Sequence, residues 1–360
     1  MPSMRAAVCQ VFGEPLVIEE VSLAAPGPNQ VRVELAAVAI CHSDIAFAEG
    51  AWGGDLPAVY GHEASGRVAE IGAGVNDLAV GDHVVVTLIR SCGECKYCRN
   101  GYEVACATTF EENAPLRDAE GSPVYPAMKT GAFAEEVVVH RSQLVAIDEQ
   151  ISLDAAALLG CGVITGVGSV TNVADVQPGS NVVVIGSGGV GLNVVQGAAL
   201  AGAAAIIAID LVDDKLQAAK EFGATHIVNA SSDDVAAAIA SVTGGEMADE
   251  VFVTVTAKAA FDQAPTLLAP TGAVVLVGLP PTGVTSTFDP LTLADQSQRM
   301  LGSKLGAARI SVDIPKLVEL YEEGRLKLDE LITGRYPLEE INEAIASVER
   351  GEALRHLIVF

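Results

Sequence analysis

Residues 181–210 read NVVVIGSGGVGLNVVQGAALAGAAAIIAID, and this stretch decides the fold of the chain around it. A β-branched run at 181–185 leads into a glycine-rich turn, a helix-forming stretch at 190–201 and a second apolar run at 205–209. No charged residue occurs from Val176 to Ile209, although Pro178 and several glycines interrupt the segment. A strand–turn–helix–strand unit whose strands are buried on both faces explains the missing charges. The pattern therefore favours a buried α/β core over a membrane span.

The turn itself, Gly186-Ser187-Gly188-Gly189-Val190-Gly191, has the spacing G-x-G-x-x-G. It follows a strand, opens a helix and is followed at the end of the next strand by Asp210, which is the context of a dinucleotide site. The first glycine allows the tight turn, the second lets a pyrophosphate approach, and the third permits close helix–strand packing. Asp210 would accept hydrogen bonds from ribose hydroxyls and repel a 2′-phosphate, which favours NAD over NADP. The alternative is a tight structural turn with Asp210 as a solvated strand end.

The secondary-structure pattern changes twice along the chain. From about 163 to 304, apolar strands alternate with helices; the strands are predicted at 181–185, 205–209, 226–229, 250–254 and 273–277, and the helices at 190–201, 213–222, 233–241 and 259–268. This alternation predicts an α/β fold with a doubly wound parallel sheet, a Rossmann domain. The preceding part has alternating segments separated by Gly, Pro and Cys clusters, which predict a mostly antiparallel β-domain. Helices at 312–323 and 338–350 and a strand at 356–360 follow.

The composition excludes several classes of function. The chain has 360 residues, a formal net charge of −25 and 50% hydrophobic residues. Attraction to nucleic acid or to acidic lipid headgroups needs a cationic field, so neither is an expected partner. A disordered acidic chain would be poorer in apolar residues. The first residues lack the apolar run of a secretory signal, so we expect a cytoplasmic protein whose cysteines stay reduced.

Four cysteines lie in one short lobe, at about residues 90–107: Cys92, Cys95, Cys98 and Cys106. Their spacing is typical of a tetrahedral zinc site. Four thiolates leave no open position on the metal, so we expect a structural zinc that holds a loop with little core of its own. Two disulfides or an iron–sulfur cluster are the alternatives.

Three more residues with metal-ligand side chains lie outside this lobe: Cys41, His62 and Cys161. Each alone is a weak signal, because buried cysteines and histidines are common structural residues. Together with the lobe and the glycine-rich loop, however, they resemble the zinc-containing medium-chain alcohol dehydrogenases. The resemblance covers the whole chain, and it includes the motifs CHSD (41–44), GHE (61–63), GCGVITG (160–166), VGLPP (277–281) and LRHLIVF (354–360).

The resemblance implies a division into domains. Residues 1–162 would form a β-rich, GroES-like catalytic domain that includes the zinc lobe, and residues 163–304 an NAD-binding Rossmann domain. Residues 305–360 would return to the catalytic domain. The resemblance also implies a second, catalytic zinc held by Cys41, His62 and Cys161, which makes two zinc ions per chain and leaves one position on the catalytic metal for substrate oxygen.

Roles near the zinc and the cofactor follow from the same resemblance. Ser43 matches the hydroxyl that carries the substrate proton away, Asp44 the carboxylate that orients the ligating histidine, and Glu63 a carboxylate close to the metal. The residues expected at the cofactor are Thr165 and Val190 at the nicotinamide, Lys215 beside the adenosine ribose, His42 and Arg355 at the pyrophosphate, and the loop glycines Gly186, Gly188, Gly189 and Gly191.

The chain departs from the family at one point. Many members end the proton relay at a histidine five residues after the first zinc cysteine, and this position is Ala46 here. The proton must then leave through water or through His42. For His42 itself, a phosphate-binding role and a relay role both stay open, and the first is preferred.

These features predict a zinc-dependent alcohol dehydrogenase. It would transfer hydride reversibly between a primary or aryl alcohol and NAD through a zinc-bound alkoxide. The alternatives are a formaldehyde dehydrogenase that oxidises the adduct of formaldehyde with a thiol and a non-catalytic protein that binds zinc and nucleotide. The expected partner is a small alcohol or aldehyde, with no nucleic acid and no membrane, and the family suggests a homodimer or homotetramer.

Overall fold

The structure, a computed structural model, describes residues 3–110 and 115–360. The chain forms two compact units. Unit 1 consists of residues 1–161, 309–323 and 328–360, and unit 2 of residues 162–308 and 324–327.

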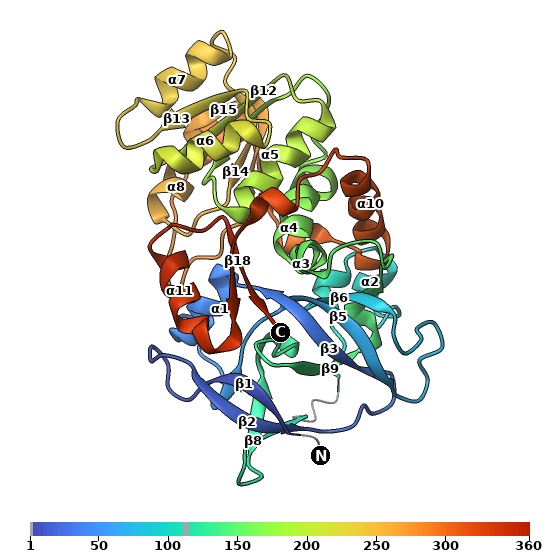
Figure 1. Cartoon of the computed structure of the whole chain (residues 1–360). Coiled ribbons are helices and arrows are strands. Elements are labelled where there is room, and N and C mark those ends of the chain that lie inside the picture. The colour runs from blue at the N-terminus through green and yellow to red at the C-terminus, as the bar shows by residue number, and fades with distance from the viewer. Residues whose placement is uncertain (1–2, 111–114) are drawn as a thin grey trace. The chain divides into compact units, whose positions relative to one another are not determined.

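Unit 2 is built on a six-stranded parallel sheet. The strand order is β13 (His226–Asn229), β12 (Ala205–Asp210), β11 (Asn181–Ile185), β14 (Ala248–Val253), β15 (Leu268–Leu276) and β16 (Arg299–Gly302). Its helices are α4 (Gly162–Gly168), α5 (Gly189–Ala201), α6 (Asp213–Glu221), α7 (Val235–Val242), α8 (Lys258–Gln263) and α9 (Pro290–Asp295). Helices α5 and α6 connect the three strands β11, β12 and β13 (Figure 1). This is the predicted doubly wound, Rossmann-like sheet.

The central strands of this sheet are apolar throughout because both of their faces are covered. Val182, Val183 and Val184 in β11 are completely buried, and the apolar residues of β12 are almost completely buried. A strand of this kind has no polar face, so its sequence shows no alternation. The uncharged stretch from Val176 to Ile209 therefore contributes two central strands to the core of unit 2. Within the described residues, no single helix is long and apolar enough to cross a membrane, and only one bent pair, 153–160 with 162–174, reaches that length and composition when taken together.

Unit 1 is the β-rich part of the chain. Five strands close a barrel in the order β1 (Ser3–Cys9), β2 (Val17–Leu23), β7 (Leu116–Arg117), β8 (Pro123–Pro126) and β4 (Ala58–Val59). A seven-stranded sheet has the order β10 (Leu144–Ala146), β6 (His83–Thr87), β5 (Glu63–Ile71), β3 (Gln30–Ala39), β18 (Arg355–Val359) and β17 (Ile332–Pro337), with β9 (Glu136–His140) also paired to β3. Most of these pairs are antiparallel, as predicted, while β4–β8 and β17–β18 are parallel.

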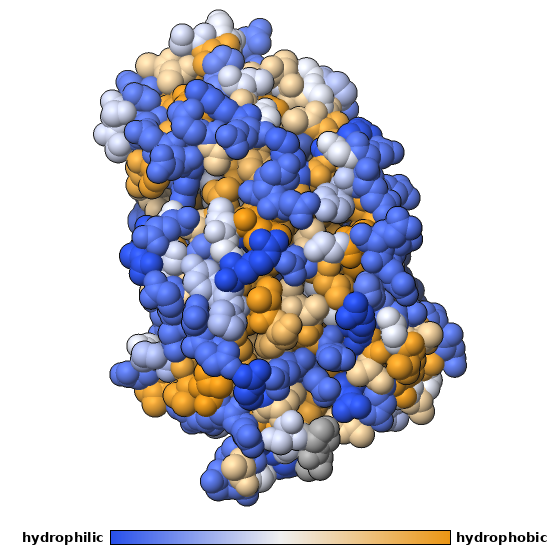
Figure 2. All heavy atoms as spheres, viewed as in Figure 1, coloured by the Kyte–Doolittle hydropathy of each residue, from blue (hydrophilic) through white to orange (hydrophobic). Residues whose placement is uncertain are grey.

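The helices of unit 1 are short at its N-terminal end and longer at its C-terminal end. They are α1 (His42–Ala48), α2 (Lys96–Arg99), α3 (Leu153–Ala157), α10 (Ile310–Glu322) and α11 (Ile341–Glu349). Hydrophilic residues cover most of the face seen in Figure 2, and hydrophobic residues form smaller areas between them. Much of the apolar half of the composition therefore lies in the two cores.

Two elements of unit 2 differ from the sequence prediction. The helix predicted at 259–268 is α8 only as far as Gln263; a 3-10 turn at Ala264–Leu267 follows, and β15 begins at Leu268. Pro265 explains the difference, because a proline lacks the N–H group that a helix needs and crowds the preceding turn. Strand β16 was not predicted at all, because it has only four residues and includes Arg299.

Candidate active site

The three side chains outside the cysteine lobe come together in unit 1. Cys41 lies between β3 and α1, His62 directly before β5, and Cys161 directly after the 3-10 turn at Leu158–Gly160. All three residues are buried, and their two sulfurs and one imidazole nitrogen lie within 4.8 Å of one another. Three segments that are far apart in the sequence thus present three metal-ligand atoms to one point.

A glycine precedes two of these ligands, and the packing requires it. Gly61 has a φ of +91°, and a Cβ at this position would lie 2.7 Å from the backbone nitrogen of Phe133. At Gly160, a Cβ would lie 2.7 Å from the carbonyl oxygen of Val86. Neither position has room for a side chain, so the backbone before each ligand lies directly against a neighbouring segment.

The carboxylate of Asp44 holds two of the three ligand segments in place. Its Oδ1 accepts hydrogen bonds from the Gly61 N–H and from the His62 Nδ1, both at 2.9 Å, and its Oδ2 accepts one from the Cys41 N–H at 3.1 Å. The side chain is only 2% exposed. Because Nδ1 of His62 donates to Asp44, Nε2 is the nitrogen left to coordinate a metal.

A metal that binds at this centre must displace protons from two of its three ligands. A side-chain hydrogen bond from Cys161 is the largest influence on Cys41 and lowers its pKa well below the usual value, while the same bond raises the pKa of Cys161. Cys41 is thus a thiolate that accepts from the Cys161 thiol. Burial lowers the pKa of His62, but Asp44 outweighs this effect and raises it well above the usual value. Once the protons of Cys161 and His62 are displaced, two thiolates and one imidazole form a donor set that zinc prefers, and three ligands leave its fourth position open.

Ser43 lies beside these ligands. Its hydroxyl donates to the Cys41 sulfur at 3.2 Å and lies 3.5 Å from His62 Nε2. Three residues further along α1, the half-buried Ala46 has no group that could continue a proton relay. The Ser43 hydroxyl therefore lies next to two of the three metal-ligand side chains.

Glu63 and Arg355 form a buried ion pair in the same unit. Arg355 Nε lies 3.6 Å from Glu63 Oε1, and the Arg355 guanidinium also donates to the Ile40 carbonyl at 3.1 Å. Burial lowers the pKa of Arg355, but Glu63 and the Cys41 sulfur outweigh it, so the pKa is raised. Arg355 therefore places a permanent positive charge close to the anionic side chains of Glu63 and Cys41. The sequence motifs placed Glu63 near the metal but gave no sign of this pairing.

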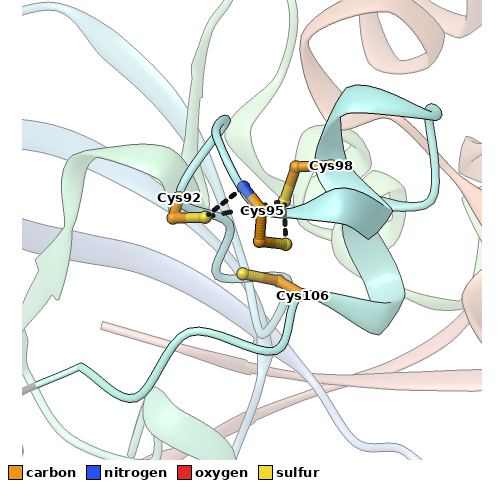
Figure 3. A group of neighbouring side chains, drawn as sticks. All are labelled: Cys92, Cys95, Cys98 and Cys106. Carbon is orange, nitrogen blue, oxygen red and sulfur yellow. Dashed lines mark hydrogen bonds between the residues drawn. The ribbon is translucent and has the colours of Figure 1, made fainter.

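The four cysteines of the lobe converge in the same way (Figure 3). Cys92 and Cys95 lie on the loop before α2, Cys98 on α2, and Cys106 just after the 3-10 turn at Glu103–Ala105. Their sulfurs lie within 4.8 Å of one another. None of residues 91–107, all of them described, is buried. The lobe therefore lacks an apolar core that could fix it, and a metal bound by four thiolates would supply this stability.

The lobe also favours deprotonation of Cys92 and Cys95, whose pKa values are both lowered. Hydrogen bonds from the Thr108 side chain and from the backbone at Glu94 and Cys95 lower the pKa of Cys92 to about 6. Burial is the largest effect at Cys98 and raises its pKa to about 12. Metal binding by thiols requires thiolates, so Cys92 is the ligand that is ready at neutral pH.

The glycine-rich loop of unit 2 has the geometry that its spacing predicts. Gly186 follows β11 with a φ of +101°. A Cβ on Gly191 would lie 1.8 Å from the Gly186 carbonyl oxygen, whereas a Cβ on Gly188 would meet no protein atom within 4 Å. Gly191 is therefore required by packing, and Gly188 borders open space next to the N-terminal end of α5. Such space beside free helix N–H groups fits a phosphate.

Asp210 lies at the end of β12, next to this loop. Its Oδ2 accepts a hydrogen bond from the Ser187 N–H at 2.7 Å, and its Oδ1 accepts from the N–H groups of Leu211 and Val212 at 2.8 and 3.1 Å. A carboxylate offers about four acceptor positions, so a ribose hydroxyl can share it. Asp210 thus fixes the loop as well as presenting a negative charge.

The other predicted cofactor residues lie on several elements. Thr165 is on α4 and Val190 on α5, and these helices pack so closely that a Cβ on Gly166 would lie 2.7 Å from the Val190 carbonyl oxygen. Lys215 is half-buried on α6. His42 begins α1 in unit 1, where it is exposed, and Arg355 is the buried residue described above. Their roles toward a dinucleotide stay predictions.

A β-rich unit with two thiolate-rich metal centres, together with a unit that carries a dinucleotide loop, defines a zinc-dependent dehydrogenase. Residues 27–149 match the family model of the alcohol dehydrogenase GroES-like domain, and residues 189–323 match that of the zinc-binding dehydrogenases. The NDMA-dependent alcohol dehydrogenase of Amycolatopsis methanolica is 37% identical over 99% of this chain and 98% of its own. The chain belongs to the zinc-containing medium-chain alcohol dehydrogenase family, and it has a structural four-cysteine zinc site and a catalytic Cys–His–Cys zinc site.

Solved structures of relatives extend the similarity. The benzyl alcohol dehydrogenase of Acinetobacter calcoaceticus superposes with a TM-score of 0.93 and is 31% identical over 100% of both chains. The acetophenone reductase of Geotrichum candidum, solved with NAD, has a TM-score of 0.84 and 26% identity over 100% of this chain and 98% of its own. A zinc-binding dehydrogenase of Sinorhizobium meliloti, solved with NADP, has a TM-score of 0.86 and 27% identity over 100% of both chains.

Proposed function

We propose that this dehydrogenase oxidises primary or aryl alcohols to aldehydes with NAD, and that the reaction is reversible. The observation that carries the proposal is the buried set of Cys41, His62 and Cys161, which offers three ligands and leaves the metal one open position. The similarity to a benzyl alcohol dehydrogenase supports an aryl substrate. In the overall reaction a hydride leaves the carbinol carbon for NAD, and the hydroxyl proton leaves for solvent.

The choice of NAD rests on Asp210. Related structures contain either NAD or NADP, so membership of the family does not decide between them. The Asp210 carboxylate lies at the end of β12, where the loop residue Ser187 also contacts it. A 2′-phosphate at this carboxylate would bring two negative charges together in a protein whose net charge is already −25.

Each residue of the centre has a proposed role in the reaction. Zinc, when held by the three ligands, supplies a Lewis acid that makes an alcohol easier to deprotonate. Asp44 keeps the His62 ring oriented, and the Ser43 hydroxyl receives the substrate proton. Because Ala46 cannot continue the relay, the proton passes from Ser43 to water or to His42.

We also propose which parts of the chain bind the zincs, the alcohol and the cofactor, and in which oligomeric state the enzyme works. Residues 1–162 and 305–360 would hold both zincs and the alcohol, and residues 163–304 would hold NAD, with Thr165 and Val190 at the nicotinamide and Lys215 at the adenosine ribose. The family resemblance favours a cytoplasmic enzyme that is a homodimer or a homotetramer. Light scattering on the purified protein would distinguish the dimer from the tetramer.

An assay of NAD reduction with zinc-loaded protein tests the proposed function. The panel contains primary, aryl and secondary alcohols, and a parallel set contains formaldehyde with and without low-molecular-weight thiols. NADP replaces NAD in one arm, and NDMA is added in another because one relative is named for its dependence on it. We expect turnover with aryl or primary alcohols and NAD. Turnover that needs a thiol would indicate the formaldehyde-adduct reaction instead, and nucleotide binding without any turnover would indicate a non-catalytic protein.

A further inference from the structure

Two amide side chains are buried in the helix that begins at the glycine-rich loop. In α5 only Asn193 and Gln196 have polar side chains, and they are 0% and 3% exposed. Burying an amide without hydrogen bonds costs free energy, so its partners in the fold indicate what it does. Neither residue belongs to the two groups of metal-ligand side chains, and the sequence motifs assign neither of them a role.

Gln196 holds a backbone segment that comes from far along the chain. Its Oε1 accepts a hydrogen bond from the Lys327 N–H at 2.7 Å, and its Nε2 donates to the Lys327 carbonyl at 3.1 Å. The same Nε2 donates to Asn193 Oδ1, also at 3.1 Å. One side-chain amide thus connects the backbone of residue 327 to the neighbouring amide on α5.

Asn193 continues this connection into the first turn of the helix. Its Nδ2 donates to the carbonyl oxygen of Gly189 at 2.7 Å. Helix α4 holds Asn193 from the other side, because a Cβ on Gly166 would lie only 2.4 Å from the Asn193 Cβ. The Asn193 side chain therefore has little freedom to move away from Gly189.

The Gly189 carbonyl belongs to the same peptide group as the Val190 N–H. A peptide group is planar, so a bond that fixes its carbonyl also fixes the direction of its N–H. The Val190 N–H lies in the first turn of α5, where N–H groups have no acceptor within the helix and are available to an anion. Asn193 thus sets the direction of one of the donors that border the open space at Gly188.

The far end of the connection is itself fixed. Lys327 Nζ donates to the Glu221 carbonyl at 2.7 Å and lies 5.7 Å from the centre of the Phe222 ring. Lys327 belongs to residues 324–327, the short second segment of unit 2, whose flanking residues belong to unit 1. The hydrogen bonds therefore run without a break from an anchored backbone segment, through Gln196 and Asn193, to the cofactor loop.

We propose that Gln196 and Asn193 are positioning residues for the dinucleotide: anchored at Lys327, they hold the Gly189–Val190 peptide in the orientation that binds the pyrophosphate. The proposal rests on the proposed use of NAD. A donor that is already oriented loses little freedom when it binds, so its loss weakens binding even though neither amide touches the ligand. Because the two residues act through one path, their effects should not add.

The test measures NAD binding by isothermal titration calorimetry on zinc-loaded protein. Gln196→Met keeps the size of the side chain but removes its three hydrogen bonds, and Asn193→Ala interrupts the path closer to the loop. We expect each variant to raise the Kd for NAD about tenfold, a change typical of leaving buried partners unpaired. The Kd of the double variant for NAD should be about equal to that of the single variant with the higher Kd. The alcohol KM at saturating NAD and the zinc content should stay unchanged.

A matched control separates positioning from stability. Thr243→Val removes a buried hydroxyl of unit 2 that bonds Ile239 and Met247 and is not connected to the loop. It should lower Tm without changing the Kd for NAD. Hydrogen exchange of the peptide covering 186–195, measured without NAD, should be faster in Gln196→Met and unchanged in Thr243→Val.

The outcomes are distinguishable. A wild-type protein that binds no NAD would overturn the proposed cofactor, and this inference with it. Wild-type binding together with an unchanged Kd in both variants would overturn this inference alone, as would a double variant whose loss is the product of the two single losses. If Gln196→Met does not fold, the Kd and the hydrogen exchange of Asn193→Ala decide the matter.

Discussion

The carboxylate of Asp44 and the imidazole of His62 lie 2.9 Å apart, and both side chains are only 1% exposed. The same carboxylate accepts from the backbone of Cys41 and Gly61. One residue without a bond to the metal thus orders two of the three segments that carry ligands. It follows that the geometry of the catalytic zinc site depends on Asp44 as much as on the ligands themselves.

Replacing Asp44 should therefore weaken the catalytic site selectively. In Asp44→Asn, an NH2 group replaces one carboxylate oxygen and faces at least one of the N–H donors of Cys41, Gly61 and His62. That donor loses its acceptor, so one side chain no longer holds both ligand segments. We expect the catalytic zinc to bind about 10–100-fold more weakly, while the structural zinc stays. Zinc content per chain, measured against increasing chelator, checks this. Asp77→Asn, which loses an exposed pair with Arg141, is the control, and equal retention of both zincs in the two variants would contradict the prediction.

Ser43→Ala should separate proton transfer from metal binding. The hydroxyl contacts the Cys41 sulfur but is not one of the three metal-ligand residues, so both zincs should remain. Loss of a positioned proton acceptor should lower kcat about 100-fold or more. Ser22→Ala, which removes an exposed hydroxyl on β2, should leave kcat unchanged. If Ser43→Ala turns over at the wild-type rate, Ser43 has no part in the relay.

Cys106→Ser should destabilise the lobe rather than the chemistry. The remaining three thiols form an incomplete tetrahedral site, and residues 91–107 have no buried core to replace it. We expect one zinc fewer per chain, a lower yield of folded protein and a lower Tm. Cys9→Ala is the control, because Cys9 is a buried cysteine outside both metal groups and should keep two zincs. A Cys106→Ser protein as stable as wild type would mean that the lobe is not a structural zinc site.

An added methyl group should affect stability at Gly191 and NAD binding at Gly188. In Gly191→Ala the new Cβ would overlap the Gly186 carbonyl oxygen, so unit 2 should lose stability and folded yield. In Gly188→Ala the Cβ meets no protein atom, so Tm should hold while the Kd for NAD rises. Thermal melts and calorimetric titration of the two variants test this pair. A Gly188→Ala protein that binds NAD as well as wild type would place the pyrophosphate elsewhere.

Glu250 should make unit 2 less stable as the pH rises. Burial, followed by the charge of Asp249, raises the pKa of this β14 carboxyl to about 7, while the Ser180 hydroxyl and Arg299 act in the opposite direction. The folded state then holds the proton more tightly than the unfolded state does. Its stabilising contribution is complete below pH 4.5 and is lost as the pH rises to about 7.

Glu250→Gln removes this dependence. Its Tm should exceed that of wild type by a few degrees at pH 8 and by less at pH 5, as melts across that range would reveal. Glu246→Gln removes the same charge from an exposed position of unit 2 and should show no such change in the difference. A Glu250→Gln protein with the same Tm advantage at both values of pH would refute the raised pKa.

The sequence predicted the local parts of the fold and the site well. The strand, loop and helix of residues 181–201 were readable because each step depends on neighbouring residues: β-branched side chains, then glycines, then helix formers. The four cysteines of the lobe were identified because thiols at close spacing have few other uses in a reduced protein, whereas Cys41, His62 and Cys161 were identified only through the family resemblance. Strand β16 was missed because a four-residue strand is paired by its neighbour β15 rather than by its own pattern. The early end of α8 was missed although Pro265 marks it in the sequence.

Interactions between distant residues could not be predicted in this way. Gln196 and Lys327 are 131 positions apart, and nothing in either local sequence indicates the other. The sequence does show two amide side chains in an otherwise apolar helix. The spacing of hydrophobic residues, however, does not indicate what these amides bind. The pairing of Arg355 with Glu63 escaped notice for the same reason, because the resemblance assigned each residue a separate role.

The path of the chain through unit 1 has a consequence for the order of folding during synthesis. Strand β18 pairs with residues 37–39 of β3, so this part of the larger sheet of unit 1 is completed only after residues 355–359 have been synthesised. Residues 162–308 of unit 2 are contiguous and emerge earlier. Local contacts form before distant ones, and domains fold as units during translation. We therefore expect most of unit 2 to fold before the larger sheet of unit 1 is complete, since only residues 324–327 of unit 2 are synthesised later.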